Sequence, residues 1–250
     1  MNQDRFDYIL HLADNALITG HRLSEWTGHG PSVEQDIAMS NIALDLVGQS
    51  RNLYQYAASM KEGATEDTLA YLRDAREFKN LLIAETGNGD WAKTITRLFF
   101  FSAYQSCLYE HMRSLRDEML RAIAEKSLKE VTYHVRWSGD WVIRLGDGTP
   151  ESRSRMEKAI DALWPLTGEM FEPAPYEKAL IPSQLAVDVA ALKQEWMHKI
   201  TGVLDNAGCR LPAPGSWMQS GGKTGIHTEA LGLLLAEMQF LQRAYPGCNW

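Results

Sequence analysis

The 250-residue chain lacks several features that would place it in a familiar class of protein. Its three cysteines are widely spaced and form no Cys-x-x-Cys pair, which argues against a disulfide framework or a zinc site. The net charge of −7 argues against general binding to nucleic acid or to an anionic membrane surface. No apolar run approaches the ~20 residues that a membrane span needs, and the polar start does not resemble a signal peptide. We therefore expect a cytoplasmic protein.

Strand-like alternation is also missing, and helical periodicity takes its place. The predicted helices cover residues 4–26, 33–60, 66–84, 91–108, 116–145, 151–170, 186–204 and 229–244. Three prolines predict an irregular segment over 172–182, and glycines with prolines predict a long loop over 206–225. The chain is therefore predicted to be all-α, with a four-helix bundle in residues 1–150. Residues 151–250 form a helical C-terminal extension packed on that bundle, in a single domain overall.

Polar residues mark the starts of several of these helices. Ser32, with Gln35 three positions later, fits a capping box at the second long helix. Asp90 and Thr228 fit the N-caps of the helices that follow them. The helix after Asp90 is apolar on nearly all sides, which predicts a central, buried position.

Asp14, Asp45 and Glu130 with His134 lie at intervals that suit the ligands of a carboxylate di-iron bundle. Such a bundle takes one Glu from each of two helices and a Glu-x-x-His from each of the other two. Here the second long helix has glycine at the histidine position, and the fourth has tyrosine, with His134 one step late. The third, around Ser102, has no carboxylate at its centre. The sequence therefore predicts a degenerate site that binds no metal, in a non-catalytic partner subunit.

A buried cluster of carboxylates needs positive charge in place of the missing metal. Lys126 and His134 each lie four residues from Glu130 and share its helix face. One hypothesis is that these two side chains neutralise the remnant formed with Asp14 and Asp45. The alternative is that some of these residues point to solvent or to neighbouring helices, and the sequence leaves both open.

Several unusual segments together resemble a known family. They are Leu12–Asn15, Arg22–Trp26, Asn41–Gln49, Lys129–His134 and Gly221–Glu229. They are similar to the structural, non-catalytic subunit of the bacterial phenylacetyl-CoA monooxygenases, also called ring-1,2-phenylacetyl-CoA epoxidases. The resemblance runs nearly end to end. Thr27 departs from the cysteine and Ser102 from the acidic residue expected in this family.

The resemblance implies a ferritin-like fold and a role in a larger assembly. A catalytic sister subunit of the same fold would carry the di-iron centre and oxidise the aromatic ring. This chain would pair with it, hold it in an active shape and help to bind phenylacetyl-CoA at the subunit interface. The resemblance implies further oxygenase subunits and a reductase that uses flavin, an iron–sulfur centre and NADPH. It implies no cofactor on this chain and a product that enters aerobic phenylacetate breakdown.

A cationic segment between the second and third long helices is the candidate CoA site. The predicted residues are Arg76, Glu77, Phe78, Lys79 and Asn80. Arginine and lysine three positions apart gather on one side of a helix or turn and suit phosphate groups. Phe78 is predicted to stack on adenine and Asn80 to hydrogen-bond its edge. The alternative is a solvated helix end whose cations pair with nearby acids.

The C-terminal part holds the candidate docking residues Trp217, Lys223 and Trp250. The alternative for the glycine-rich stretch around Lys223 is an ordinary linker. Two other functions stay open from the sequence alone: a self-contained ferritin-like di-iron oxidase with unusual ligands, and a helical adaptor with no CoA role. The single Glu-x-x-His, at Glu195–His198, lies outside the four helices and is interpreted as surface charge.

Overall fold

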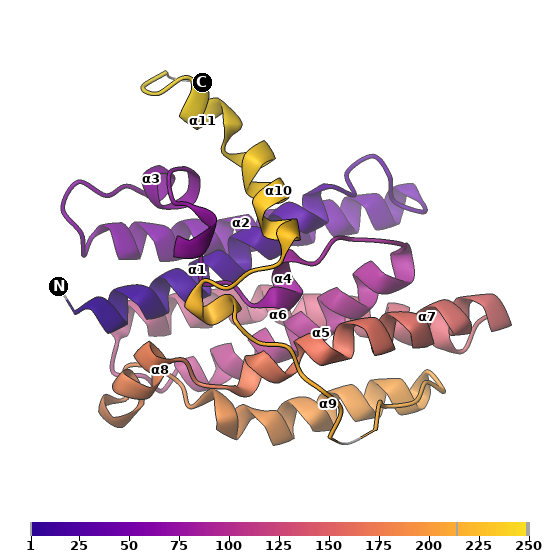
Figure 1. Ribbon diagram of the computed structural model, residues 1–250. Helices are drawn as coiled ribbons and strands as arrows, with labels where there is room; N and C mark the ends of the chain where they lie inside the picture. The colour runs from indigo at the N-terminus through magenta and orange to yellow at the C-terminus, as the bar shows by residue number, and fades with distance from the viewer. Residues whose placement is uncertain (1, 214, 249–250) are drawn as a thin grey trace.

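Four long helices form the body of the molecule in the computed structural model, which describes residues 2–213 and 215–248. They are α1 (Gln3–Ser24), α2 (Val33–Ala58), α5 (Trp91–Met112) and α6 (Glu118–Gly146). α1 packs along α2, α5 packs along α6, and α2 also contacts α6 (Figure 1). No β-strand occurs in the described ranges. The predicted all-α, ferritin-like bundle with additional C-terminal helices is thus confirmed.

α5 is the central helix, as its apolar sequence predicts. Phe99, Phe100, Phe101 and Tyr104 are almost completely buried. Two helices from the C-terminal part of the chain, α7 (Pro150–Leu163) and α9 (Lys193–Asn206), pack against it. Trp196 of α9 donates its indole N–H to the carbonyl oxygen of Phe100 at 3.0 Å. Buried side chains from both parts of the chain therefore belong to one continuous core.

The helix starts match the sequence only in part. Asp90 caps α5 by accepting the N–H of Lys93 at 2.9 Å, as predicted. The capping box at α2 is wrong, because Ser32 makes no side-chain cap bond. Gln35 instead accepts the indole N–H of Trp141 at 2.8 Å and so links α2 to α6. The long-range contact competes successfully with the local one.

Two shorter segments of the chain differ from the prediction. Residues 66–84 form α3 (Glu66–Tyr71), a 3₁₀ turn (Ala75–Glu77) and α4 (Leu82–Glu85) rather than one helix. Arg73 stabilises the break by donating to the carbonyl oxygens of Leu69 and Glu77. Within 172–182, expected to be irregular, α8 (Pro175–Leu180) begins at a proline, a favoured residue for the first helical position.

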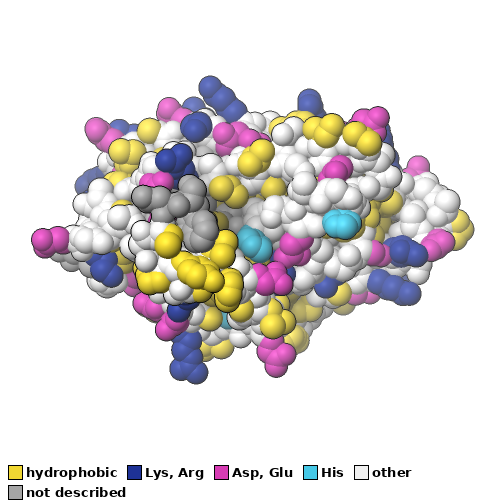
Figure 2. Space-filling model, turned by 90° about the horizontal axis from the view of Figure 1, so that it is seen from above, with side chains coloured by type: hydrophobic (Ala, Val, Ile, Leu, Met, Phe, Trp, Pro, Cys, Tyr) yellow, Lys and Arg dark blue, Asp and Glu magenta, His cyan; other side chains and the backbone are white. Residues whose placement is uncertain are grey.

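The chain ends in α10 (Glu229–Met238) and α11 (Phe240–Ala244), which rise away from the bundle (Figure 1). Gln239 lies where they meet and anchors them by donating to the carbonyl oxygens of Ala70 and Arg73. Hydrophobic side chains gather beside these helices (Figure 2). The exposed ones are Leu233, Phe240, Leu241 and Tyr245. None of the described helices is both long and apolar enough to cross a membrane.

Candidate functional site

Asp14, at the middle of α1, is completely buried and fully bonded. Both terminal nitrogens of the Arg73 guanidinium contact its carboxylate, which pairs the two charges inside the protein. The carboxylate also accepts the hydroxyl of Tyr54 at 2.5 Å and the backbone N–H of Lys79 at 2.8 Å. Burial of Arg73 lowers its pKa, but the charge of Asp14 and the hydrogen bond to it, together with Tyr54 and Glu77, outweigh that effect and raise the pKa. Asp14 is therefore held as an ion pair by a cation from the irregular segment after α3.

The other members of the predicted remnant lie between α2 and α6, apart from this ion pair. The Nε2 atom of buried His134 is 3.0 Å from Asp45 Oδ2. Glu130 accepts the side-chain amide of Gln49 at 2.9 Å. His134 therefore partners one acid, as the neutralisation hypothesis expected. The part of that hypothesis that concerns Lys126 is wrong, because Lys126 is exposed and Arg73 supplies the cation for Asp14.

The interior of the bundle holds neutral groups where a metal would need ligands. Tyr109 donates its hydroxyl to Gln49 at 3.2 Å, and Gln105 donates to Tyr109 at 3.3 Å. Ser102, at the centre of α5, is buried with a hydroxyl that has no bonding partner in the structure. No group of three or more His, Cys, Asp or Glu residues suited to a metal occurs within the described part of the chain. These residues do not fit a di-iron centre, which takes four carboxylates and two histidines.

The lone Glu-x-x-His motif lies on α9, away from the bundle interior. His198 is exposed, and Glu195 lies 3.4 Å from His111 and 3.5 Å from Lys199. These contacts are those of ordinary surface charge, as the sequence indicated.

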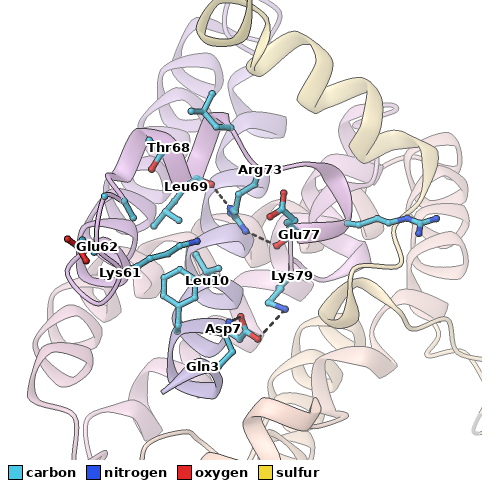
Figure 3. Close-up of a pocket in the computed structure, with 15 residues that line it drawn as sticks. Gln3, Asp7, Leu10, Lys61, Glu62, Thr68, Leu69, Arg73, Glu77 and Lys79 are labelled. Atoms are coloured by element: carbon cyan, nitrogen blue, oxygen red, sulfur yellow. Dashed lines mark hydrogen bonds and ion pairs between the residues drawn. The ribbon is translucent and has the colours of Figure 1, made fainter. Parts of the chain in front are cut away.

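A cavity of about 580 Å³ lies over the N-terminal half of α1, beside the predicted CoA segment (Figure 3). The cations Lys61, Arg73, Arg76 and Lys79 line it, together with the acids Asp7, Glu62 and Glu77. Lys79 lies 3.6 Å from Asp7, an open ion pair at the cavity wall. The cavity therefore gathers cations from the loop after α2 and from the segment before α4.

Phe78 and Asn80 do not face this cavity, which corrects their predicted roles. Phe78 is completely buried, with the guanidinium of Arg73 4.1 Å from the centre of its ring. Asn80 is also buried and donates to Glu85 at 2.8 Å. Neither side chain offers a surface on which adenine stacks or an edge that adenine reaches. Of the five predicted residues, Arg76, Glu77 and Lys79 line the cavity.

The predicted docking residues have three different outcomes. Trp217 is 71% exposed, as a docking residue requires. Lys223 is wrongly placed among them: it is buried and donates to Glu177 at 2.9 Å and to the carbonyl oxygen of Glu172 at 3.1 Å. Its ion pair fastens the glycine-rich stretch to the body of the protein. Trp250 lies outside the described residues.

A second buried carboxylate network, which no sequence pattern indicated, is centred on Glu85 of α4. His227 Nδ1 lies 2.7 Å from Glu85, and Thr228 donates both its backbone N–H and its hydroxyl to the same carboxylate. The other ring nitrogen of His227 lies 2.9 Å from the carbonyl oxygen of Phe78. Burial lowers the pKa of His227, but the hydrogen bonds to Glu85 and to the Phe78 carbonyl oxygen, together with the charge of Glu85, outweigh it and raise the pKa. The partners are about 140 residues apart in the chain, so no local pattern reveals them.

The fold and these contacts define an all-helical, ferritin-like protein whose di-iron ligand positions are taken by neutral or internally paired side chains. A family described as phenylacetic acid catabolic protein matches residues 1–250, and the chain belongs to that family. It is 44% identical over 243 residues to the C subunit of the 1,2-phenylacetyl-CoA epoxidase of Escherichia coli (strain K12). The match covers 97% of this chain and 98% of that relative.

Proposed function

We propose that this chain is the structural subunit of a multicomponent phenylacetyl-CoA epoxidase in phenylacetate degradation. It pairs with a catalytic di-iron sister subunit, stabilises it and helps to bind the acyl-CoA. The observation that carries the proposal is the pairing of Asp14 with Arg73, which fills a ligand position with an internal ion pair. The likeness to one subunit of a 1,2-phenylacetyl-CoA epoxidase supports it. Iron then belongs to the sister subunit, and flavin, iron–sulfur and NADPH chemistry belongs to a reductase.

This chain's contribution to substrate binding is electrostatic. The CoA moiety carries several ionised phosphate groups, which arginine and lysine bind well. Lys61, Arg76 and Lys79 surround the cavity over α1 and supply three such cations. We place the CoA phosphates there, with Lys79 exchanging its open contact with Asp7 for a phosphate oxygen.

Iron analysis tests the non-catalytic part of the proposal. The chain is expressed alone in iron-rich medium and its metal is measured by elemental analysis. We expect a metal content near zero. About two irons per chain, as in intact carboxylate bundles, would favour a self-contained oxidase.

Affinity for CoA tests the substrate part. In the complex with the sister subunit, Arg76→Ala with Lys79→Ala is expected to weaken binding of phenylacetyl-CoA about tenfold or more, since charge-assisted bonds contribute roughly 1.5–3 kcal/mol. Arg155→Ala is the matched control, because it removes an exposed, ion-paired arginine from α7. Calorimetric titration measures both. Equal affinity in all three proteins would remove the cavity over α1 from CoA binding and leave the pairing role intact.

A further inference from the structure

α2 carries an apolar stripe on the side that faces away from the core. Val33 is 72% exposed, Ile37 57%, Leu44 68% and Val47 42%. Their spacing of four, seven and three residues keeps them on one helical face. The opposite face of α2 is already buried, through Met39, Ile42, Leu46 and Leu53. α2 is therefore apolar on two sides, and on the outer side the loop after α1 bonds Asp36 and Ser40 but leaves the four apolar side chains exposed.

α7 shows what a solvated helix of this protein looks like. Its exposed positions carry charged residues, among them Glu151, Arg155, Lys158 and Asp161. That is the usual pattern, in which the apolar stripe faces the core and charge faces water. The outer face of α2 departs from it, and a contiguous exposed apolar patch marks an interaction surface.

α6 extends this apolar stripe with aromatic side chains. Three side-chain hydrogen bonds join the two helices and show that they lie side by side and antiparallel. They pair Gln35 with Trp141, Asp45 with His134 and Gln49 with Glu130. Next to them on α6, Tyr133 is 38% exposed and Trp137 is half-buried. Tyrosine and tryptophan are enriched among the residues that dominate binding at protein interfaces.

Two carboxylates lie in the seam between these helices and open toward the same face. The side chain of Asp45 is 36% exposed with His134 as its bonded partner, and Glu130 is half-buried with neutral Gln49 as its partner. Within residues 33–50, α2 also carries Glu34 and has no lysine or arginine, while Asp36 accepts the backbone N–H of Gly28. Arg136 is exposed beside Tyr133, 5.9 Å from the centre of its ring, and no ion pair joins it to the seam acids in the described chain. The face is therefore apolar with an acidic seam, which matches an apolar partner that carries a basic side chain.

We propose that this α2–α6 face, formed by Val33, Ile37, Leu44, Val47 and Tyr133 around the acidic seam, is the docking surface for the catalytic sister subunit. The partner presents an α-helix whose apolar stripe packs on α2 and whose lysine or arginine lies over Asp45 and Glu130. This assignment rests on the proposed function.

Size and charge both favour this occupant. Residues 33–51 of α2 span about 27 Å, and two adjacent helices are each about 10 Å wide. The projected area of this face is about 500 Å². Protruding side chains add surface to it and bring it closer to the ~800 Å² per partner of a stable interface. A second copy of this chain docked α2 against α2 would bring acids to acids, and like charges facing each other across an interface are unfavourable. A basic partner helix avoids that repulsion.

The test is complex formation with the sister subunit by variants of the exposed stripe. Ile37→Glu with Leu44→Glu is expected to weaken the complex at least about 100-fold, because it places charge at the centre of the face. Leu233→Glu is the matched control, since Leu233 on α10 is as exposed as Val33 and lies in the other hydrophobic patch. Its affinity is expected to stay within about twofold of the wild type. Titration calorimetry gives the affinities, and circular dichroism checks that each variant is folded.

The outcomes distinguish failure of the docking surface from failure of the proposed function. If the wild-type chain pairs with the sister subunit and the α2 double variant pairs equally well, the docking surface is wrong and the proposed function stands. If the wild type itself does not pair, the proposed function fails. If the chain alone forms a dimer that the double variant abolishes, the face belongs to a second copy and the assignment is overturned. Should the double variant misfold, Ile37→Ser with Leu44→Ser replaces it, and unchanged affinity there overturns the proposal equally.

Discussion

The buried acids on the α1 side and the acids between α2 and α6 have opposite surroundings. Asp14, Glu85 and Glu177 are each almost completely buried, and each contacts a cationic or ionisable partner from elsewhere in this chain. The partners are Arg73, His227 and Lys223. Asp45 and Glu130 are partly exposed, and their side-chain partners within the described residues are His134 and Gln49. On the α1 side the buried acids are paired with ionisable groups of this chain, whereas the acids between α2 and α6 are partly exposed at the surface.

The difference follows from where the partners originate. Arg73 comes from the irregular stretch between α3 and α4, and Lys223 and His227 come from the stretch before α10. All of these pack over α1, so segments outside the four long helices supply the charge that the buried acids need. The outer face of α2 is reached by the loop after α1, whose Gly28 and Thr27 bond Asp36 and Ser40, but this loop leaves Ile37 and Leu44 exposed. The additional segments thus complete one side of the bundle, and we assign the other side to the sister subunit.

Arg73→Met is expected to have the largest effect on stability, and it tests the α1 side, where the buried acids pair within the chain. It leaves Asp14 buried without its cation, and breaking a buried ion pair costs about 3–5 kcal/mol of unfolding free energy. Urea unfolding followed by circular dichroism measures the loss. Arg76→Met, which removes an exposed arginine three residues away, is expected to change stability by less than about 0.5 kcal/mol.

The double variant Asp14→Asn with Arg73→Met sharpens this result. Removing the charge from both partners is expected to recover part of the lost stability, because the desolvation cost of a lone carboxylate disappears. Equal losses in the single and double variants would mean that Arg73 acts through its backbone contacts to Leu69 and Glu77 instead.

The pH dependence of stability tests the Glu85 network and is expected to be smaller. The pKa of His227 is raised in the folded state, so the folded protein binds this proton more tightly than the unfolded chain. The stabilisation is complete below the unfolded value of about 6.5 and is lost as the pH rises through the folded pKa. His11 has the opposite sign: burial lowers its pKa to about 4, so its contribution is lost as the pH falls below about 6.5.

The difference between wild type and His227→Gln isolates the first effect, since both proteins keep His11. We expect their unfolding free energies to converge as the pH is raised from 6 to 9, in urea titrations at each pH. A difference that is constant over this range would show that His227 stabilises the stretch before α10 without its proton.

The long helices of the bundle could be predicted because their periodicity and an N-cap such as Asp90 are local properties. The contacts of Asp14 could not, since Arg73 lies 59 residues away on a segment with no periodicity. Because Phe78 lies in the same irregular segment, the sequence predicted that it is accessible. In the structure its ring packs against the Arg73 guanidinium. The outer stripe of α2 was present in the sequence, because Ile37, Leu44 and Val47 fall on a different face from Ile42 and Leu46. Two apolar faces on one helix are the signal for a partner.

Lys126→Met is the smallest expected effect, and it bears directly on the contrast between the two sides. Lys126 shares a helix face with Glu130, so the sequence alone suggests that it neutralises the acids there. In the structure it is exposed at the edge of α6, and Glu130 is bonded to Gln49 instead. An exposed lysine of this kind contributes little, so we expect a change of unfolding free energy below about 0.5 kcal/mol by urea denaturation. A loss of several kcal/mol would mean that the seam between α2 and α6 is completed by this chain's own lysine. The acids would then need no cation from a partner, and the contrast between the two sides would disappear.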